Sequence, residues 1–384
     1  MQKKFKILHV TRNFPPLQGG MERLNQKLFC IMSQRWQMIL CGPKGASAFV
    51  PAESIVKETA LNPLGWFLTK TLCISIFNAL KNRPELVVAG SGLTAPIAYV
   101  AAKLSGAQSV VYLHGLDVVV PNKFYQWCWL PLIRRCDHVL VNSKSTANLA
   151  VDKGVAESKI DLLLPGTDIP ILNNSNAADF RSEHRLASNK ILLVVGRLTA
   201  RKGIAEFVSN CLPEITRSFP EVKLVIIGAE ATQALAGGKQ NEKNEIQRQA
   251  DTAGVGDNIR FLGRCSDQQL SGAYQAADIH IFPVIELTGD IEGFGMVAIE
   301  AAAHGLHTIA FAVGGVSESV ADNQSGDLIL AGNYCQFTKK VLSRLSAGRK
   351  DSDLAACLAF AESNSWNNFE KNINSLCDRW QVQS

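Results

Sequence analysis

The residue types best suited to chemistry gather in the segment "GDIEGFGMVAIEAAAHGL", residues 289–306. Glu292 precedes a Gly-Phe-Gly step. Glu300 follows eight positions later in an alanine-rich run that predicts a helix beginning near Gly295 or Met296. The start of such a helix exposes free N–H groups and partial positive charge, which suit a phosphate or a polar ring. One carboxylate in the preceding loop and one about a turn into the helix can accept hydrogen bonds from hydroxyl groups. A sugar nucleotide carries both a diphosphate and hydroxyl-bearing rings.

A second candidate segment, "VVGRLTARKG" at residues 194–203, places Arg197 and Lys202 between a strand and a helix. Two cations at the carboxyl end of a strand can hold a diphosphate, Arg197 through a forked contact and Lys202 as a point charge. Taken alone, the pair could equally belong to a solvated loop. With Glu292 and Glu300 expected on the same edge of the sheet, the pair predicts a diphosphate site. The sequence contains no GxxxxGK[ST] phosphate loop, and no GxGxxG motif follows a strand.

The first half of the chain offers two weaker candidates. In "GGMER", Gly19 and Gly20 follow the first expected strand and permit close approach of the backbone to a phosphate, although a tight turn would give the same pattern. In "YLHGLD", His114 lies just past a strand end, where α/β sheets place functional groups. The alternative is a structural histidine whose ring nitrogens are hydrogen-bonded within the protein.

A segment of mixed aromatic and basic character, "NKFYQWCWLPLIRRCDH", covers residues 122–138. Such a mixture suits a membrane-interface or lipid-acceptor surface, and the core packing of a helix against a sheet explains it equally well. The residues concerned are Lys123, Phe124, Tyr125, Trp127, Trp129, Arg134 and Arg135.

The positive charge of the chain is concentrated in its first half. Residues 1–180 hold 19 Lys and Arg against 11 Asp and Glu, a net charge of +8, whereas the remainder holds 20 against 23, a net charge of −3. A basic half favours an anionic partner such as a membrane surface or a phosphorylated acceptor. A solvated basic face is the alternative.

Several classes of protein are not indicated. The N-terminus shows no apolar run of signal-peptide length, and the segment nearest to a membrane span, residues 64–80, is interrupted by Lys70. The ten cysteines form no CxxC pair and no His-linked metal spacing, which predicts reduced, mostly buried thiols of a cytosolic protein. The one Asp-x-Asp, at 351–353, is interpreted as a loop or helix cap, so no divalent metal is expected.

Short apolar strands alternate with helices through both halves, the pattern of parallel sheets covered on both faces. We expect ten strands, within 5–10, 85–90, 109–115, 138–143, 161–166, 191–197, 222–228, 258–263, 278–284 and 307–313. The polar residues 166–185 fit a linker. The fold class is therefore α/β with two doubly wound domains, 1–180 and 181–363, and ligands at the carboxyl ends of the strands. A final helix in 364–384 presents an apolar face, made of Trp366, Phe369, Ile373, Leu376 and Trp380.

Taken together, these motifs resemble the family 4 retaining glycosyltransferases, which have the GT-B fold of two Rossmann-like domains facing a cleft. The resemblance covers nearly the whole chain. "GRLTARKG" and "EGFGMVAIEAAAHG" are its most specific parts, and "FPPLQGGMERL", "YLHG" and "VNSKST" occur in the expected order. "FLGR", residues 261–264, resembles the segment beside the nucleobase, and the last helix resembles one that crosses back to the first domain.

The resemblance implies a role for each candidate residue. Arg197 and Lys202 would hold the donor diphosphate, Glu292 the hydroxyls of the transferred sugar, and Glu300 the ribose. His114 would lie beside the sugar near the reacting centre. The remaining contacts are implied for the backbone of Gly19, Gly20, Gly293, Phe294, Gly295, Met296 and Val297, and for Gly263 and Arg264 near the base.

The resemblance further implies transfer of a sugar from a GDP- or UDP-sugar to a glycan or lipid-linked acceptor, with retention of configuration and no cofactor. It is closest to bacterial enzymes of lipopolysaccharide, capsule or glycolipid synthesis, which predicts a cytoplasmic protein with peripheral contact to the anionic inner membrane and no nucleic-acid partner. A metal-free nucleotide-sugar epimerase of the same fold and a nucleotide-sugar-binding protein without turnover are the alternatives.

Overall fold

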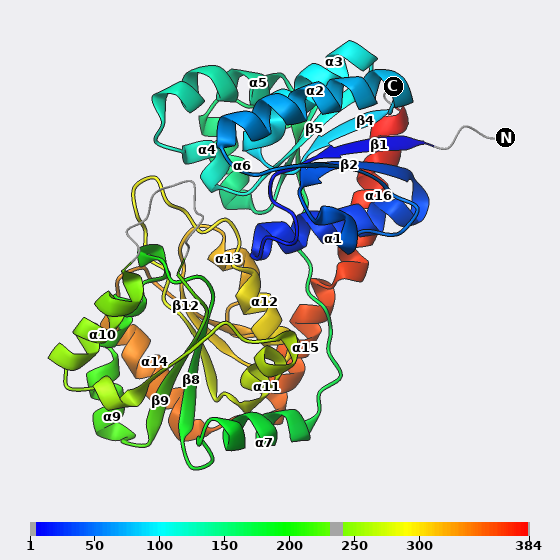
Figure 1. The fold of residues 1–384 in the computed structure, drawn as a ribbon. Helices are drawn as coiled ribbons and strands as arrows, with labels where there is room; N and C mark the ends of the chain where they lie inside the picture. The colour runs from blue at the N-terminus through cyan, green and yellow to red at the C-terminus, as the bar shows by residue number, and fades with distance from the viewer. Residues whose placement is uncertain (1–4, 231–240, 383–384) are drawn as a thin grey trace. The chain divides into compact units, whose positions relative to one another are not determined.

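The computed structural model describes residues 5–230 and 241–382, which form two compact units (Figure 1). The first unit comprises the chain up to Gly166 together with the last helix, α16 (Trp366–Val382). The second unit runs from Thr167 to Ser365. Each unit consists of one parallel β-sheet with helices on its faces, which confirms the predicted α/β fold class.

The sheet of the first unit has the strand order β3-β2-β1-β4-β5-β6-β7, and every neighbouring pair is parallel. Its strands are β1 (Lys6–Val10), β2 (Gln37–Pro43), β3 (Ile55–Thr59), β4 (Leu86–Ala89), β5 (Gln108–Leu113), β6 (His138–Val141) and β7 (Ile160–Leu162). Its helices are α1 (Gly20–Arg35), α2 (Leu64–Asn82), α3 (Ala95–Ser105), α4 (Leu116–Val119), α5 (Leu130–Arg135), α6 (Lys144–Asp152) and α16.

The sheet of the second unit has the order β10-β9-β8-β11-β12-β13, again with parallel pairs throughout. Its strands are β8 (Lys190–Val195), β9 (Val222–Ile227), β10 (Ile259–Gly263), β11 (Ile279–Phe282), β12 (Thr308–Phe311) and β13 (Gly326–Ile329). Its helices are α7 (Asn174–Glu183), α8 (Ile204–Asn210), α9 (Leu212–Ser218), α10 (Glu242–Thr252), α11 (Asp267–Ala276), α12 (Met296–Ala303), α13 (Val316–Ser319), α14 (Tyr334–Ala347) and α15 (Asp351–Ser363).

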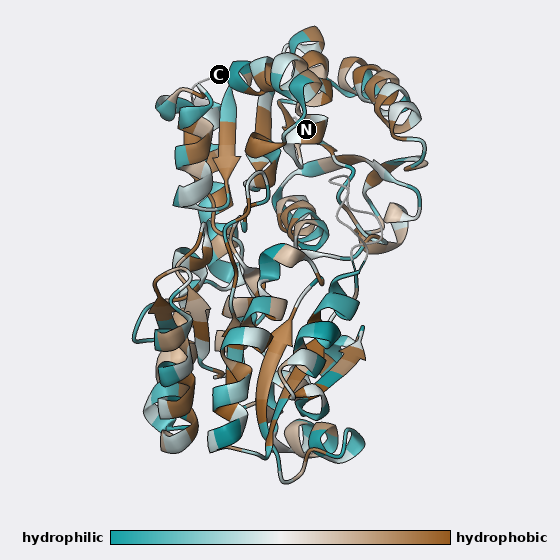
Figure 2. Ribbon diagram, turned by 90° about the vertical axis from the view of Figure 1, so that its left-hand side faces the viewer, coloured by the Kyte–Doolittle hydropathy of each residue, from teal (hydrophilic) through white to brown (hydrophobic). Residues whose placement is uncertain are grey.

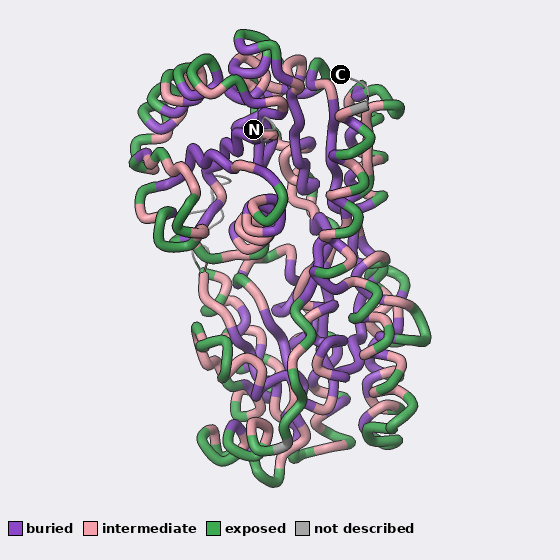
Figure 3. The backbone as a smooth tube through the Cα atoms, turned by 90° about the vertical axis from the view of Figure 1, so that its right-hand side faces the viewer, coloured by how far each residue is buried: buried purple, intermediate pink, exposed green. Residues whose placement is uncertain are grey.

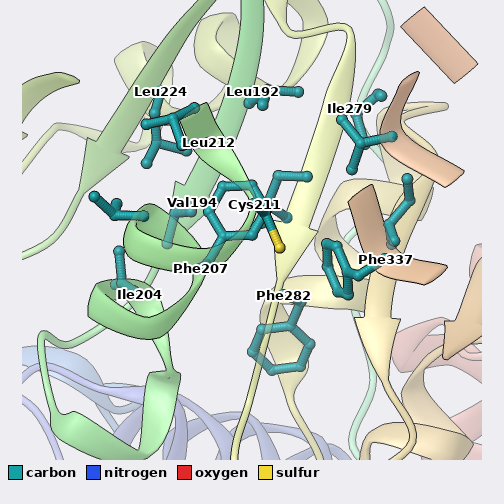
Figure 4. Close-up of a cluster of buried hydrophobic side chains, with 14 of the residues drawn as sticks. Leu192, Val194, Ile204, Phe207, Cys211, Leu212, Leu224, Ile279, Phe282 and Phe337 are labelled. Carbon is teal, nitrogen blue, oxygen red and sulfur yellow. The ribbon is translucent and has the colours of Figure 1, made fainter. Parts of the chain in front are cut away.

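The strands are apolar throughout because both faces of each sheet are covered. In β8, Leu192 and Val194 join a core with Phe207 of α8 and Phe337 of α14 (Figure 4). The alternate residues Ile191, Leu193 and Val195 join a different core, which lies under α7 and α11. Successive side chains of a strand point to opposite faces, so an uninterrupted apolar run is what a sheet between two helix layers requires.

The same layering is visible along the whole chain. The strands are mainly brown in Figure 2 and mainly purple in Figure 3, whereas most helices show a hydrophilic, exposed side. None of the helices in the described ranges is both long and apolar enough to cross a membrane.

Each of the ten predicted runs overlaps a strand of the structure. Three further strands, β2, β3 and β13, were not predicted. The interpretation of residues 166–185 as a linker was wrong for its second part, because α7 (Asn174–Glu183) forms there and packs against α11. Phe180 is buried in that contact, and the Asn173 side chain caps the helix by accepting from the Ser175 N–H.

The division between the units follows from these contacts. It falls after Gly166 and after Ser365, whereas the sequence placed the boundaries after 180 and 363. A boundary at 180 would cut α7 away from the second sheet, with which it packs through α11.

The last helix, α16, belongs to the first unit. Trp380 is buried, its ring stacks on His138 at a centroid distance of 4.6 Å, and its Nε1 donates to Asp161 at 3.2 Å. Arg35 of α1 pairs with Asp378 at 2.7 Å. The helix is therefore fixed against both β6 and α1 of that unit.

Candidate functional site

The loop between β8 and α8 carries Arg201 and the predicted residues Arg197 and Lys202. Gly203 ends its short 3₁₀ turn with φ of +64°, and a Cβ there would lie 2.0 Å from the carbonyl oxygen of Pro283. Only glycine fits this position, because it combines positive φ with direct backbone contact. The Ile285 N–H donates to the Arg201 carbonyl at 2.9 Å, so the loop is held against the end of β11.

Glu292 lies at the centre of a buried ion cluster formed with this loop. Its Oε2 accepts from Lys202 Nζ at 2.7 Å and from Arg201 Nη1 at 3.1 Å. Arg201 Nη1 also donates to the Ile291 carbonyl at 3.0 Å, and Asp290 Oδ1 lies 3.2 Å from Arg201 Nε. The side chains of Lys202 and Glu292 are each only 11% exposed, so this is a desolvated pair of opposite charges. The cluster thus joins the two segments that the sequence singled out.

Burial and charge act against each other on both partners. Burial raises the pKa of Glu292, but the charges of Lys202 and Arg201 outweigh it, so the pKa lies below its usual value. Burial lowers the pKa of Lys202, and attraction to Glu292 restores only part of the difference. Lys202 Nζ also lies 4.7 Å from the ring centroid of Phe282, the lowest side chain labelled in Figure 4.

Arg197 takes a different position from Lys202. Its side chain is exposed, yet its charge contributes to lowering the pKa of both Lys202 and Glu292. The three predicted charged residues therefore share one electrostatic environment at the carboxyl ends of β8 and β11. Arg197 is the one of the three that is open to solvent.

The loop that carries Glu292 is fixed by close backbone packing. The Gly315 N–H donates to the Glu292 carbonyl at 3.0 Å, and a Cβ at Gly315 would lie 2.0 Å from the Gly293 carbonyl oxygen. Gly293, Phe294 and Gly295 are buried along this stretch.

Helix α12 begins at Met296 with Gly295 as its N-cap, as the sequence predicted. The first N–H groups of a helix lack partners within it, and Met296 and Val297 are both only half-buried. The start of α12 therefore presents backbone donors beside the ion cluster.

Glu300 lies further along α12 and is half-buried. The hydroxyl of Tyr274 donates to Glu300 Oε2 at 3.2 Å, and the Tyr274 ring stacks on His304 at a centroid distance of 4.9 Å. Tyr274 is 1% exposed and comes from α11, so a buried phenol orients this carboxylate.

Gly263 ends β10 with φ of +68°. Its carbonyl accepts from the Gly228 N–H at 2.7 Å, and no atom lies within 4 Å of the place where a Cβ would stand. Arg264 follows with an exposed side chain. This segment therefore forms an open edge next to the end of β9.

In the first unit, His114 follows β5. It is 6% exposed, and its Nε2 donates to the Gly90 carbonyl at 2.9 Å in the tautomer that this contact favours. Its Nδ1 is buried and has no hydrogen-bond partner among the described residues. The His114 N–H donates to Asp117 at 3.2 Å, and burial raises the pKa of that carboxyl despite this hydrogen bond.

Gly19 and Gly20 stand at the start of α1, with Gly19 as the N-cap. The residue beyond them that ties this helix to the His114 region is Asn25, whose Nδ2 donates to the Gly90 carbonyl at 3.1 Å. Gly90 thus accepts from both His114 and Asn25. The candidates of the first unit are joined through one carbonyl at the end of β4.

Sequence reasoning missed Arg201 and Tyr274. Arg201 was readable as the neighbour of Lys202 in the same basic loop. Tyr274 had no signal, because its contact with Glu300 depends on how α11 packs beside α12. Within residues 5–230 and 241–382, no group of three or more His, Cys, Asp or Glu side chains is placed to hold a metal ion.

Both halves of the chain match known sequence families. Residues 176–356 match the family model described as "Glycosyl transferases group 1", and residues 18–169 match the one described as "Glycosyltransferase Family 4". The two parallel sheets and these family matches together define the chain as a glycosyltransferase with the GT-B fold.

Individual relatives agree with this class. The chain is 25% identical over 341 residues to the GDP-mannose-dependent α-(1-6)-phosphatidylinositol monomannoside mannosyltransferase of Mycolicibacterium smegmatis, covering 84% of this chain and 85% of the relative. It is 30% identical over 237 residues to the D-inositol 3-phosphate glycosyltransferase of the same organism, covering 60% of this chain and 51% of the relative.

Among solved structures, HepE from Anabaena in complex with UDP has a similar fold. The TM-score is 0.79 at 19% identity, and the match covers 98% of this chain and 100% of HepE.

Proposed function

We propose that the protein transfers a sugar from a GDP- or UDP-sugar to a hydroxyl of a glycan or lipid-linked acceptor, with retention of anomeric configuration, as a family 4 glycosyltransferase. The observation that carries this proposal is the buried cluster of Lys202, Arg201 and Glu292 beside the start of α12. It combines fixed cations for a leaving diphosphate with a fixed carboxylate for sugar hydroxyls.

Three charged side chains would have different roles in the proposed donor site. The Lys202 ammonium donates one of its three N–H groups to Glu292, and the other two can donate to phosphate oxygens. Arg197, being exposed, is the cation free to form a forked contact with the diphosphate. Arg201 holds Glu292 in place, so that the other carboxylate oxygen can accept from the transferred sugar.

The remaining donor contacts follow the order of the chain. The N–H groups of Met296 and Val297 would meet the phosphates, and Glu300, oriented by Tyr274, would accept from the ribose. Gly263 and Arg264 would lie beside the base. We assign the backbone of Gly19 and Gly20 in the first unit to the diphosphate, and His114 to the sugar.

Transfer with retention on this plan needs no protein nucleophile. The bond between the anomeric carbon and the leaving phosphate oxygen breaks, the acceptor oxygen bonds to the same face, and its proton passes to the leaving phosphate. Arg197 and Lys202 stabilise the negative charge that develops on the diphosphate. We therefore expect the reaction to proceed without a divalent metal.

The acceptor is proposed to be lipid-linked or a glycan, as in bacterial lipopolysaccharide, capsule or glycolipid synthesis. One relative is named for phosphatidylinositol monomannoside, a lipid-linked glycan. We further propose a cytoplasmic protein that binds the anionic inner membrane peripherally through its basic first unit.

Two exposed surfaces of that unit support the membrane proposal. Trp127 is 81% exposed next to Lys123, whereas Trp129 is tied inward through its Nε1 to the Leu93 carbonyl. The aromatic-basic segment therefore splits between an exposed and a packed part. Helix α2 likewise exposes Trp66, Phe77 and Leu80 beside two lysines, and none of its residues is acidic.

A donor screen tests the proposed activity. Thermal unfolding would be followed across GDP- and UDP-sugars, and the stabilising donor would then be incubated with candidate acceptors. Release of free nucleoside diphosphate that depends on the acceptor, with a product of retained configuration by NMR, is the expected result. Conversion of the donor sugar without an acceptor would indicate an epimerase, and binding without turnover a non-catalytic protein.

A further inference from the structure

Arg12 is a buried cation to which the proposed reaction has given no role. It follows β1 (Lys6–Val10), at the carboxyl end of an inner strand of the first sheet. The residue is 7% exposed, and its Nε has no hydrogen-bond partner among the described residues. Arg12 also takes part in none of the ion pairs found between described residues. A guanidinium carries five N–H donors, so its hydrogen-bonding capacity is left largely unused.

The residues next to Arg12 form hydrogen bonds with one another. Asn13 Nδ2 donates to Glu22 Oε1 at 2.8 Å, and the Asn13 N–H donates to the Thr11 hydroxyl at 3.0 Å. The other oxygen of Glu22 lies over Gly19, where a Cβ would stand 2.3 Å from it. The loop after β1 therefore lies against the first turn of α1, beside Gly19.

Glu22 influences Arg12 without pairing with it. Burial lowers the pKa of Arg12, and the charge of Glu22 raises it only in part. A buried charge without a hydrogen-bonded partner costs stability, and such groups occur where function requires them. Packing alone would be served better by an apolar side chain of the same length.

We propose that Arg12 binds a phosphoryl group in the first unit, with the Gly19–Gly20 step allowing that group to approach the backbone. This rests on the proposed function, which supplies two sources of the phosphoryl group. One is the diphosphate of the donor, and the other is a phosphate carried by the acceptor. Both offer the anionic oxygens that the unused N–H donors require.

The local test is the Nε–H resonance of Arg12 in ¹⁵N-labelled full-length protein, assigned by its absence from Arg12→Lys. In one arm the nucleoside diphosphate of the stabilising donor is added alone. In the other, inorganic phosphate is added after that nucleotide has saturated its site. A shift in the first arm identifies the donor as the source, and a shift only in the second identifies the acceptor. No shift in either arm overturns the proposal, even if the enzyme is active.

Variants separate ligand binding from a structural role. Arg12→Met should weaken binding in the responding arm by about tenfold or more while leaving the thermal midpoint unchanged or higher, because a buried unpaired charge is removed. Glu22→Gln should tighten binding, because it keeps the acceptor for Asn13 and removes a competing negative charge. Arg83→Met, at an exposed arginine of the same unit, is the matched control. A clear fall in the midpoint of Arg12→Met relative to this control would assign Arg12 a structural role instead.

Discussion

Replacing Lys202 by Met should damage both the stability and the activity of the enzyme. The Lys202–Glu292 pair is 2.7 Å long with both side chains 11% exposed, and breaking a buried pair costs about 3–5 kcal/mol. Arg201 Nη1 remains 3.1 Å from the same oxygen and still partners Glu292, so we expect a cost at or just below the lower limit of this range, about 2–3 kcal/mol. For a unit of this size that is about 4–12 °C in the midpoint of thermal unfolding. Turnover should fall by about 10²–10³-fold, because a fixed cation is lost from the leaving diphosphate.

Arg197→Met is the matched control, since it removes a cation of the same loop that is exposed. Its stability should stay within about 0.5 kcal/mol of wild type, while its turnover falls.

The difference in unfolding free energy between wild type and Lys202→Met should also depend on pH. Because the pKa of Glu292 lies below its usual value, the pair contributes fully above about pH 4.3 and is lost as pH falls through the folded-state pKa. Calorimetric unfolding at pH 7 and at acid pH measures this. If Lys202→Met were as stable as the wild type at pH 7, the stabilising role of the buried Lys202–Glu292 pair would be refuted.

Four further outcomes are expected. Glu292→Gln should lower turnover more than nucleotide affinity, whereas Glu300→Gln should weaken binding of the nucleoside diphosphate itself; equal calorimetric effects would undo this division. Transfer should continue at nearly its usual rate in excess EDTA, and rescue by Mg²⁺ after inhibition would contradict the cation clamp. Because burial lowers the pKa of Lys202, its cation should be lost, and turnover should decline, as pH rises through a value below the pKa of an ordinary lysine. Lys202→Arg should abolish that decline. Replacing Trp127 by Ser and Arg135 by Glu should reduce binding to anionic liposomes at low salt without changing donor affinity; wild-type protein that ignores such liposomes would favour a soluble acceptor.

The fold was largely predictable because buried parallel strands have a strong apolar pattern. Of the three strands that were not predicted, β3 and β13 depart from that pattern for physical reasons, whereas β2 follows it. In β3, Lys57 and Glu58 interrupt the apolar run because the strand lies at the edge of its sheet. In β13, Asp327 is buried, and a hydrogen bond with His307 and ion pairs with Lys340 and Arg344 compensate for the burial of its charge. Neither compensation is visible locally in the sequence.

The candidate site was predictable as two segments but not as one cluster. Residue types assigned Lys202 to a phosphate, and the family resemblance assigned Glu292 to the transferred sugar. Nothing in the sequence indicated that the two side chains contact each other. That contact depends on Gly203, which lets the β8 loop reach the backbone after β11. The role of Tyr274 likewise depends on packing between helices far apart in sequence. Local sequence patterns identify the side chains that could bind a ligand, whereas tertiary contacts decide which of them lie in the same cluster.

The central claim is that the cluster around Glu292 serves sugar transfer. The most direct measurement is the release of free nucleoside diphosphate from the stabilising nucleotide sugar, with and without acceptor, by wild type and Glu292→Gln side by side. We predict release by wild type only in the presence of acceptor, and a large loss in Glu292→Gln, which should still bind the nucleotide. Equal release by both proteins, or release by wild type that is indifferent to the acceptor, would contradict the claim.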